Sequence, residues 1–219
     1  MKTARADKGE RLRFPGVRAP APLLSADAEG QLSPRQVDLL DELEERILHG
    51  GLAELTMAEI AAQSGCSLRT LYGIAPSKDE LLLTIVDRRL RRIGRAAIEA
   101  LDASMSSIDA LRAYLKAANE AVQPESVAMS ADFKKVAGAI RLFSAHEAYI
   151  TAITQSLLDR AVSGGEIAAV DTAAVAHVLG SLGREFSQPE VADTVHDSPK
   201  ETADAVTELI LRGLLSRSS

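Results

Sequence analysis

Residues 55–81, LTMAEIAAQSGCSLRTLYGIAPSKDEL, constrain the fold most, because they hold three helix-start signals in fewer than thirty residues. Thr56 and Glu59 have the spacing of a capping box, and Gly65 is a stop signal that follows after roughly two helical turns. Ser67 then caps a second short helix, which ends at the next glycine. Two short helices joined by a glycine turn are typical of a helix-turn-helix, whose second helix can enter the major groove of DNA.

Longer helices are predicted on both sides of this motif. Ser33 and Pro34 combine an N-cap serine with a proline in the first turn, and the helix that they start should end at the glycine pair at residues 50–51. Its outer face is acidic and would be repelled by phosphates, so we expect it to support the motif rather than to touch DNA along its length. Ser77 and Glu80 form a second capping box, which opens a much longer helix.

The rest of the chain has helical periodicity and lacks the alternation typical of strands. Aromatic residues make up only 3% of the sequence and Trp is absent, so Ala and Leu must fill the core, which favours helices. The predicted fold class is all-α, with an N-terminal three-helix helix-turn-helix domain at residues 33–78 and a C-terminal helical domain at residues 79–219. Within the second domain, the segment at residues 131–162 is long enough for two helices.

Residues 1–32 differ in composition from the rest of the chain. The whole sequence has a net charge of −6, yet its first 20 residues carry six Lys or Arg against two acidic residues. Pro15, Pro20 and Pro22 interrupt this segment, which has no helical period, so we expect a flexible basic N-terminal arm at residues 1–32. Such an arm can lie along DNA phosphates and add salt-dependent affinity; an unstructured extension without a partner is the alternative.

Several classes of protein and site are disfavoured by what the sequence lacks. One cysteine, Cys66, excludes an internal disulfide framework, and no apolar run approaches the roughly 18 residues of a membrane span. The polar start MKTARADKGER lacks the apolar stretch of a secretory signal, so we expect a cytoplasmic protein without a membrane partner. No nucleophile motif, glycine-rich phosphate loop or paired-carboxylate spacing occurs, so we expect neither an enzyme nor a bound cofactor. Metal-site spacing is also absent among His49, His146, His177 and His196.

Five short pieces of the sequence match a known family in order and in spacing. They are ILHGG, LTMAEIA, SGCS, TLY and PSKDEL. With these pieces, residues 35–82 resemble the DNA-binding domain of the tetracycline-repressor (TetR) family of bacterial transcription regulators. Any one piece is a weak signal, whereas all five in order are specific; the rest of the chain matches the family only by its length and helical architecture.

The resemblance implies a set of DNA-binding residues on the helix-turn-helix. The recognition helix and its exit would meet base edges and the nearest phosphates, while residues at the starts of the neighbouring helices would hold the DNA backbone without specifying sequence. The implied residues are Ser67, Leu68, Arg69, Thr70, Tyr72 and Gly73 for the first role, and Thr56 and Lys78 for the second. Leu71 should face the core.

One segment and two single residues depart from the family pattern. Residues 73–75 are Gly-Ile-Ala where most relatives have a buried phenylalanine, so we expect Ile74 to repack into the seam and to leave fewer phosphate contacts. Arg69 stands where relatives usually have a small residue; it could pair bidentately with guanine, and binding to a phosphate or to an acidic neighbour is the alternative. Cys66 replaces a small aliphatic residue, and we expect a buried, unreactive thiol rather than a redox sensor.

A run of arginines follows on the long helix. Arg88 lies ten residues beyond Lys78, hence about 15 Å further from the DNA at about 1.5 Å per residue. We therefore expect pairing with the acidic first helix, or contacts between the domains, rather than direct DNA contact. This expectation covers Arg88, Arg89, Arg91, Arg92 and Arg95.

The resemblance also implies roles for the helical domain. In relatives the last two long helices pair with their copies across a two-fold axis to form a homodimer. The matching apolar residues here are Val175, Val178, Leu179, Leu182, Phe186, Ala205, Leu209, Leu211 and Leu214. The middle helices of relatives hold an effector cavity, for which polar or aromatic side chains of this chain are candidates. They are Tyr114, Phe133, Phe143, His146, Tyr149 and Gln155.

The function implied is that of a TetR-family-like DNA-binding transcriptional regulator. In this family the regulator is most often a ligand-responsive repressor that binds an inverted-repeat operator in double-stranded DNA as a homodimer. The effector is an unknown small molecule. The alternative is a helical module that binds a small molecule or a protein, and whose helix-turn-helix has diverged so far that it does not bind DNA.

Overall fold

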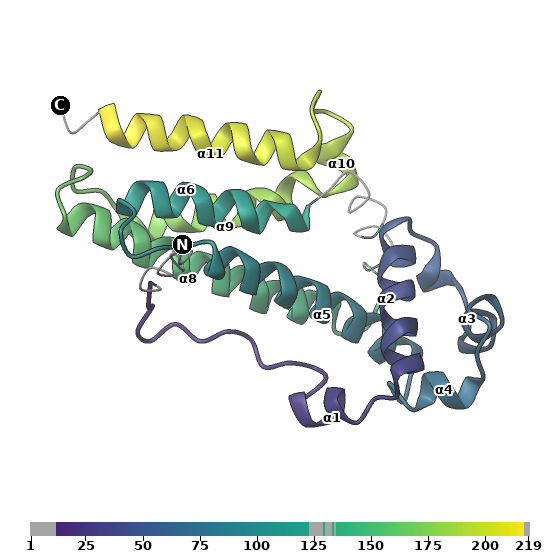
Figure 1. Cartoon of the computed structure of the whole chain (residues 1–219). Coiled ribbons are helices and arrows are strands. Elements are labelled where there is room, and N and C mark those ends of the chain that lie inside the picture. The colour runs from purple at the N-terminus through teal and green to yellow at the C-terminus, as the bar shows by residue number, and fades with distance from the viewer. Residues whose placement is uncertain (1–11, 123–128, 130–132, 134, 217–219) are drawn as a thin grey trace, which may run out of the picture.

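The computed structural model describes residues 12–122, 129, 133 and 135–216. Within these residues the chain is built from helices and contains no β-strand, which confirms the predicted all-α fold class. Figure 1 shows two parts: a small group of helices at one end of the molecule, and a bundle of helices that lie alongside one another.

The first helix of the small group, α2 (Pro34–Leu48), begins where the sequence predicts. Ser33 Oγ accepts the backbone N–H of Gln36 at 3.3 Å, and Gln36 Oε1 accepts the N–H of Ser33 at 2.9 Å, which completes a capping box. The helix ends before Gly50 and Gly51, whose φ angles of +76° and +80° lie in the left-handed region that favours glycine. Its apolar face is buried in the core of this part of the molecule.

The predicted helix-turn-helix is formed by α3 (Met57–Gln63) and α4 (Leu68–Tyr72), which pack against each other. A short 3-10 helix, η1 (Leu52–Glu54), precedes α3. Gly65 turns the chain between the two helices with a φ of +58°. The frequent helix breaks in the sequence therefore produce this compact arrangement.

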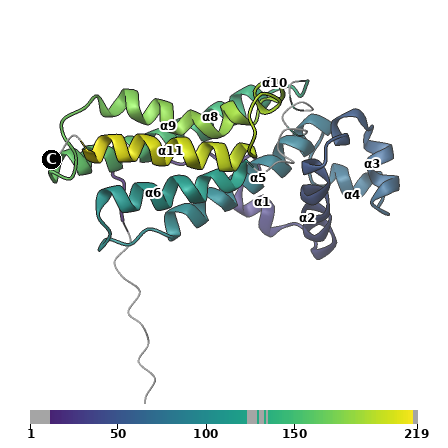
Figure 2. The same ribbon diagram turned by 90° about the horizontal axis from the view of Figure 1, so that it is seen from above.

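The long helix α5 (Lys78–Glu99) joins the two parts of the molecule, as both views in Figures 1 and 2 show. Near its start, Leu81, Leu82 and Ile85 are buried in the same core as α2. Near its end, Ala97 is buried in the separate core of the bundle. Because α5 belongs to both cores, a displacement of α5 within the bundle must also displace the packing of the helix-turn-helix.

In the part of the chain that the structure describes, the bundle is formed by four long helices and two short ones. α8 packs against α6 and α9, and α11 packs on α6 and α9. Their bounds are α6 (Ser107–Ala118), η2 (Asn119–Ala121), α8 (Ala139–Ser163), α9 (Thr172–Phe186), α10 (Pro189–Ala192) and α11 (Pro199–Ser216). Of the two helices expected within residues 131–162, the structure describes one, α8, which begins at Ala139 after Gly138 with a φ of +89° and continues to Ser163. The residues before Gly138 lie partly outside the described residues.

Two glycines of α9 allow close approach of its neighbours. A Cβ atom on Gly180 would lie 2.5 Å from Thr151 Oγ1 and 3.2 Å from the Cα of the same threonine on α8. A Cβ atom on Gly183 would lie 3.3 Å from a methyl group of Val122 and 3.4 Å from Asn119 Oδ1. A larger residue at Gly180 would therefore push α9 away from α8.

Residues 12–32 differ from the flexible arm that the composition predicts. We call them the N-terminal strap, because they run along the molecule beside α5 and end in the short helix α1 (Ala26–Gly30) (Figure 1). Leu12 is buried in the bundle core, and Leu24 packs against the core of the helix-turn-helix part. The strap thus touches both cores. Residues 1–11 of the expected arm lie outside the described residues.

Polar contacts attach the strap to α5. The backbone N–H of Leu23 donates to Asp87 Oδ2 at 3.0 Å, and Arg91 donates to the carbonyl of Pro20 at 2.5 Å. Arg88 pairs with Glu29 on α1 at 3.0 Å. These contacts join residues far apart in the sequence and have no local period, which is why the composition alone suggested an unstructured segment.

Candidate nucleic-acid interface and internal cavity

The outer face of α4 presents Leu68, Arg69 and Tyr72 to solvent. All three are exposed, and Tyr72 keeps 53% of its accessible surface. Arg69 forms no side-chain hydrogen bond or ion pair with any residue that the structure describes. Leu71, on the opposite face, is fully buried in the core. The outer face of α4 is therefore available to a partner, while its inner face holds the helix in place.

Ser67, Thr70 and Gly73 surround this face. Ser67 Oγ accepts the backbone N–H of Thr70 at 3.1 Å and lies 2.9 Å from Thr70 Oγ1, so the two hydroxyls cap the helix. A Cβ atom on Gly73 would lie 2.7 Å from Gln36 Nε2, which donates to the Thr70 carbonyl at 3.3 Å. Gly73 therefore lets a glutamine of α2 hold the end of α4. Sequence reasoning did not identify Gln36, because nothing local places α2 beside the end of α4.

The two residues after Gly73 fill the seam where relatives of the resembled family have an aromatic side chain. Ile74 and Ala75 are both buried in the core that α2, α3 and α5 share. Ile74 thus repacks into the seam, as expected. The exit from α4 is closed by apolar packing and offers no additional polar side chain at these two positions.

Thr56 and Lys78, expected at the DNA backbone, already have partners within the chain. Lys78 Nζ donates to the carbonyl of Ala53 at 2.6 Å, which leaves two ammonium N–H groups. The Thr56 hydroxyl donates to Glu59 at 2.7 Å, and the backbone N–H and hydroxyl of Thr56 together lower the pKa of Glu59. The start of α3 therefore carries an exposed carboxylate. A phosphate could bind at Thr56 only after this contact is released.

A buried carboxylate fastens α2 to α5. Glu44 is only 4% exposed, accepts two hydrogen bonds from Arg92, and lies 3.6 Å from the guanidinium of Arg89. On the next turn of α2 towards its start, Asp41 pairs with Arg88 at 2.6 Å. These contacts confirm the predicted pairing with the acidic first helix for Arg88, Arg89 and Arg92. Arg91 instead donates to the Pro20 carbonyl, and Arg95 pairs with no acidic residue that the structure describes. We refer to the contacts of Glu44 with Arg89 and Arg92 as the α2–α5 ion-pair cluster.

Cys66 lies in the turn between α3 and α4. It is half-buried and packs against the core of the helix-turn-helix part. Burial raises the pKa of its thiol, so the thiolate required for redox chemistry is disfavoured. This environment supports the expectation of an unreactive thiol.

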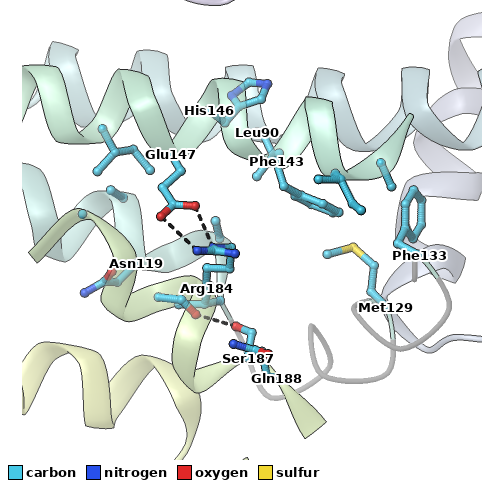
Figure 3. Close-up of a pocket in the computed structure, with 18 of the residues that line it drawn as sticks. Leu90, Asn119, Met129, Phe133, Phe143, His146, Glu147, Arg184, Ser187 and Gln188 are labelled. Atoms are coloured by element: carbon cyan, nitrogen blue, oxygen red, sulfur yellow. Dashed lines mark hydrogen bonds and ion pairs between the residues drawn. The ribbon is translucent and has the colours of Figure 1, made fainter. Parts of the chain in front are cut away.

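A cavity of about 250 Å³ lies within the bundle, bordered by α6, α8 and α9 (Figure 3). Apolar side chains form most of its wall; they include Leu90, Leu115, Met129, Ile150 and Leu179. Charged groups lie at its border, where Glu147 of α8 pairs with Arg184 of α9 at 2.6 Å. Because these two charges neutralise each other, the cavity presents an apolar interior with few free polar groups.

The structure places the six expected cavity residues in different surroundings. Three of them line this cavity: Phe133, Phe143 and His146. Tyr149 borders a second, smaller cavity instead. Tyr114 is buried in the bundle core and Gln155 borders neither cavity, so these two expectations are corrected. In a bundle rich in Ala and Leu, the sequence did not distinguish the helix faces that meet the cavity from those that meet the core.

His146 connects the cavity wall with α5 and the strap. Its Nε2 lies 2.9 Å from Asp87 Oδ1, and both side chains are almost completely buried. The other oxygen of the Asp87 carboxylate accepts the backbone N–H of Leu23. A continuous polar path therefore leads from the cavity through α5 to the strap. Sequence reasoning missed Asp87, because an isolated acidic residue within an arginine-rich segment suggests only a solvated side chain.

The residues expected at a dimer interface divide by burial. Four of the expected dimer-interface residues are buried within the chain and belong to the bundle core: Leu179, Leu182, Leu211 and Leu214. Val175 and Phe186 are half-buried against the same core. Val178, Ala205 and Leu209 remain exposed, and Leu209 keeps 71% of its accessible surface. The exposed residues lie on α9 and α11, which pack side by side.

None of the described helices has the length and apolarity that crossing a lipid bilayer requires. In the same part of the chain, no group of three or more His, Cys, Asp or Glu side chains is placed to hold a metal ion.

The exposed α4, the short α3 before it and the long α5 behind it define a helix-turn-helix protein with a second, helical domain. Residues 39–85 match the family model of bacterial regulatory proteins, tetR family. This match covers α3, α4 and parts of α2 and α5. No curated protein matches the chain.

Solved structures resemble the chain over most of its length. A TetR family transcriptional regulator, PfmR from Thermus thermophilus, is 27% identical, with a TM-score of 0.59 over 80% of this chain and 98% of that chain. A transcriptional regulator from Cytophaga hutchinsonii is 17% identical, with a TM-score of 0.65 over 84% of this chain and 98% of that chain. A TetR family regulator from Agrobacterium tumefaciens is 16% identical, with a TM-score of 0.64 over 82% and 97%. The last two similarities concern the fold alone.

The match of the helix-turn-helix to the family model and the shared fold agree with each other. Residues 39–85 therefore form a DNA-binding domain of the tetR-family type, and the chain shares its fold with a solved TetR family transcriptional regulator.

Replacing Glu44 with Ala should lower the free energy of unfolding by about 2 to 4 kcal/mol, because breaking a buried ion pair leaves a charge without its partner. The charge left behind is the guanidinium of Arg89, whose side chain is only 12% exposed. Urea denaturation at one fixed protein concentration measures the change. Glu45→Ala, on the exposed face of the same helix, is the matched control and should change stability by less than about 0.5 kcal/mol. Equal losses in the two variants would contradict a structural role for the α2–α5 ion-pair cluster.

Proposed function

We propose that the chain is a ligand-responsive repressor that binds an inverted-repeat operator as a homodimer. The observation that carries this proposal is the outer face of α4, which belongs to a helix-turn-helix of the TetR family and has no partner for Arg69 on the described chain. A protein of this kind acts on chromosomal DNA without catalysing a reaction, so we also propose a cytoplasmic location and no enzymatic activity.

In this proposal α4 enters the major groove and Arg69 contacts a base edge. Its guanidinium is exposed and unpaired, and its planar donors match O6 and N7 of guanine. Ser67, Leu68, Thr70, Tyr72 and the backbone at Gly73 would contact neighbouring bases, sugars and phosphates. Lys78 keeps two N–H groups for a phosphate, whereas Thr56 would first have to release Glu59.

The proposed dimer forms through the exposed faces of α9 and α11. Val178, Ala205 and Leu209 are exposed there, and Leu215 near the end of α11 is partly exposed as well. Two-fold pairing would remove these apolar side chains from water. The same symmetry would have to place the two α4 helices about 34 Å apart, which is the spacing of successive major grooves.

We propose a small, uncharged and mostly apolar effector for the cavity next to Phe143. The wall is apolar, and the charges of Glu147 and Arg184 are already paired, so an additional charge would be buried without a partner. The cavity volume of about 250 Å³ also favours a compact molecule, because pockets for drug-sized ligands measure about 300–1,000 Å³. Contact with His146 would reach α5 through Asp87, and α5 continues into the core of the helix-turn-helix.

A second candidate function is that of a helical binding module that does not bind DNA. The carboxylate of Glu59 at the start of α3 and the engagement of Lys78 favour this alternative, because both reduce the attraction for phosphates. A mobility-shift experiment with DNA from upstream of the chain's own gene separates the two functions.

In that experiment the wild-type chain should retard an inverted-repeat sequence. Arg69→Ala should lower discrimination at one base position of each half-site by about 1 to 3 kcal/mol, because one bidentate contact is lost. Arg18→Ala, which removes an exposed arginine of the strap, should leave binding unchanged. An Arg69→Ala chain with unaltered base preference would refute base contact by Arg69, and failure of the wild-type chain to bind any tested operator would favour the DNA-free module.

Leu209→Asp should raise the dissociation constant of the homodimer roughly a hundredfold or more, because the two-fold axis would bury an unpaired carboxylate from each subunit. Sedimentation equilibrium over a range of protein concentrations measures this constant. Met105→Asp changes an exposed apolar residue on the turn before α6 and should leave it unaltered. A Leu209→Asp chain that dimerises like the wild type would exclude this face of α11 from the interface.

A further inference from the structure

A second cavity, of about 210 Å³, lies between the strap, α5 and α8. It shares Leu90 and His146 with the effector cavity, and these two side chains therefore form a common wall. The strap closes it with Ala19 and Pro20. This cavity has no role in the proposed regulator. The strap residues that close it come before residues 39–85, the segment that matches the TetR family model.

Two guanidinium groups lie on the α5 side of this second cavity. Arg91 donates to the carbonyl of Pro20 at 2.5 Å, which holds its guanidinium at the wall and leaves other N–H groups for a ligand. Arg95 follows one helical turn later, so it shares the same face of α5. It is exposed and forms no side-chain hydrogen bond or ion pair with any described residue. Glu99 also borders the cavity, but it has a partner of its own.

The remaining walls combine a phenol with apolar surface. Tyr149 of α8 borders the cavity, and burial raises the pKa of its hydroxyl, which therefore remains a hydrogen-bond donor at neutral pH. Leu90 and Ile98 supply apolar contacts. Gly94 lies between the two arginines on α5, and a Cβ atom there would have no atom within 4 Å, so the space above it is open.

We propose that the second cavity binds a compact organic carboxylate, with its anionic group between Arg91 and Arg95 and its apolar body above Gly94. Guanidinium groups bind carboxylates through paired, charge-assisted hydrogen bonds, which makes two of them on one face a specific feature. The size also fits, because a cavity of about 150 Å³ holds benzene. The second cavity therefore favours an anion, whereas the effector cavity favours an uncharged ligand. In the effector cavity Arg184 is already paired with Glu147.

Isothermal titration calorimetry of the full chain with benzoate tests this proposal, and benzamide is the uncharged probe of the same shape. Benzoate should bind with one site per chain and at least tenfold more tightly than benzamide. Arg95→Met should weaken benzoate binding at least tenfold, whereas Arg18→Met, which removes an exposed arginine elsewhere on the strap, should leave it unchanged. Arg95 is exposed and unpaired, so its replacement should preserve the fold; the thermal unfolding curve verifies this.

Two filling variants locate the bound benzoate. Gly94→Leu places a side chain in the open space of the second cavity and should abolish binding, while Ala118→Leu occupies the effector cavity and should leave binding unchanged. Loss of binding in Ala118→Leu but not in Gly94→Leu would overturn the proposal, because benzoate would then occupy the effector cavity. Equal affinities for benzoate and benzamide, equal effects of Arg95→Met and Arg18→Met, or no binding of benzoate at all would overturn it as well. None of these outcomes depends on whether the chain binds DNA.

Discussion

The carboxylate of Glu44 determines how the helix-turn-helix is attached to the rest of the molecule. A buried carboxylate is costly unless it is paired and hydrogen-bonded, and here Arg89 and Arg92 from successive turns of α5 supply the compensation. Moving or rotating α2 relative to α5 would separate these groups and leave the charge uncompensated. The compensation is incomplete, because Nε of Arg89 is buried without a hydrogen-bond partner, so the pair contributes more to the orientation of α2 than to net stability.

Polar contacts also attach α5 to the bundle and to the strap. Asp87 binds His146 of α8 and the backbone of Leu23, while Arg91 binds the carbonyl of Pro20 in the strap. One helix therefore holds the helix-turn-helix, the wall of the cavity proposed for an effector, and the strap through separate polar contacts. An effector can change the position of α4 only by its different affinities for two arrangements of these elements. The polar path through His146 provides a place where such a difference can arise.

The features that the sequence predicted correctly are those with local causes. Helix starts at Ser33, Thr56 and Ser67 depend on side chains three residues apart, and the glycines with positive φ mark the turns by themselves. The pairing of the arginine run with α2 also followed from charge segregation along two helices. These signals were sufficient for the all-α fold class and the helix-turn-helix.

The features that sequence reasoning missed depend on contacts between distant residues. The apolar residues of the strap are interrupted by prolines and show no helical period, although Leu12 and Leu24 pack into two different cores. Leu179 and Leu211 were expected at the dimer interface and Tyr114 at a ligand cavity, but all three are buried in the bundle core. In a bundle where most faces are apolar, only the packing shows which face meets the core.

We infer that the α2–α5 ion-pair cluster makes the helix-turn-helix and α5 one rigid unit. Double electron–electron resonance tests it with nitroxide labels on α3 and α6, introduced by Ala62→Cys and Lys116→Cys in a Cys66→Ser chain that is diluted with unlabelled protein. We expect a narrow distance distribution for this chain and for the same chain with Glu45→Ala, and a clearly broader one with Glu44→Ala. An equally narrow distribution with Glu44→Ala would contradict the claim, because the orientation of the helix-turn-helix would then be maintained without the buried carboxylate.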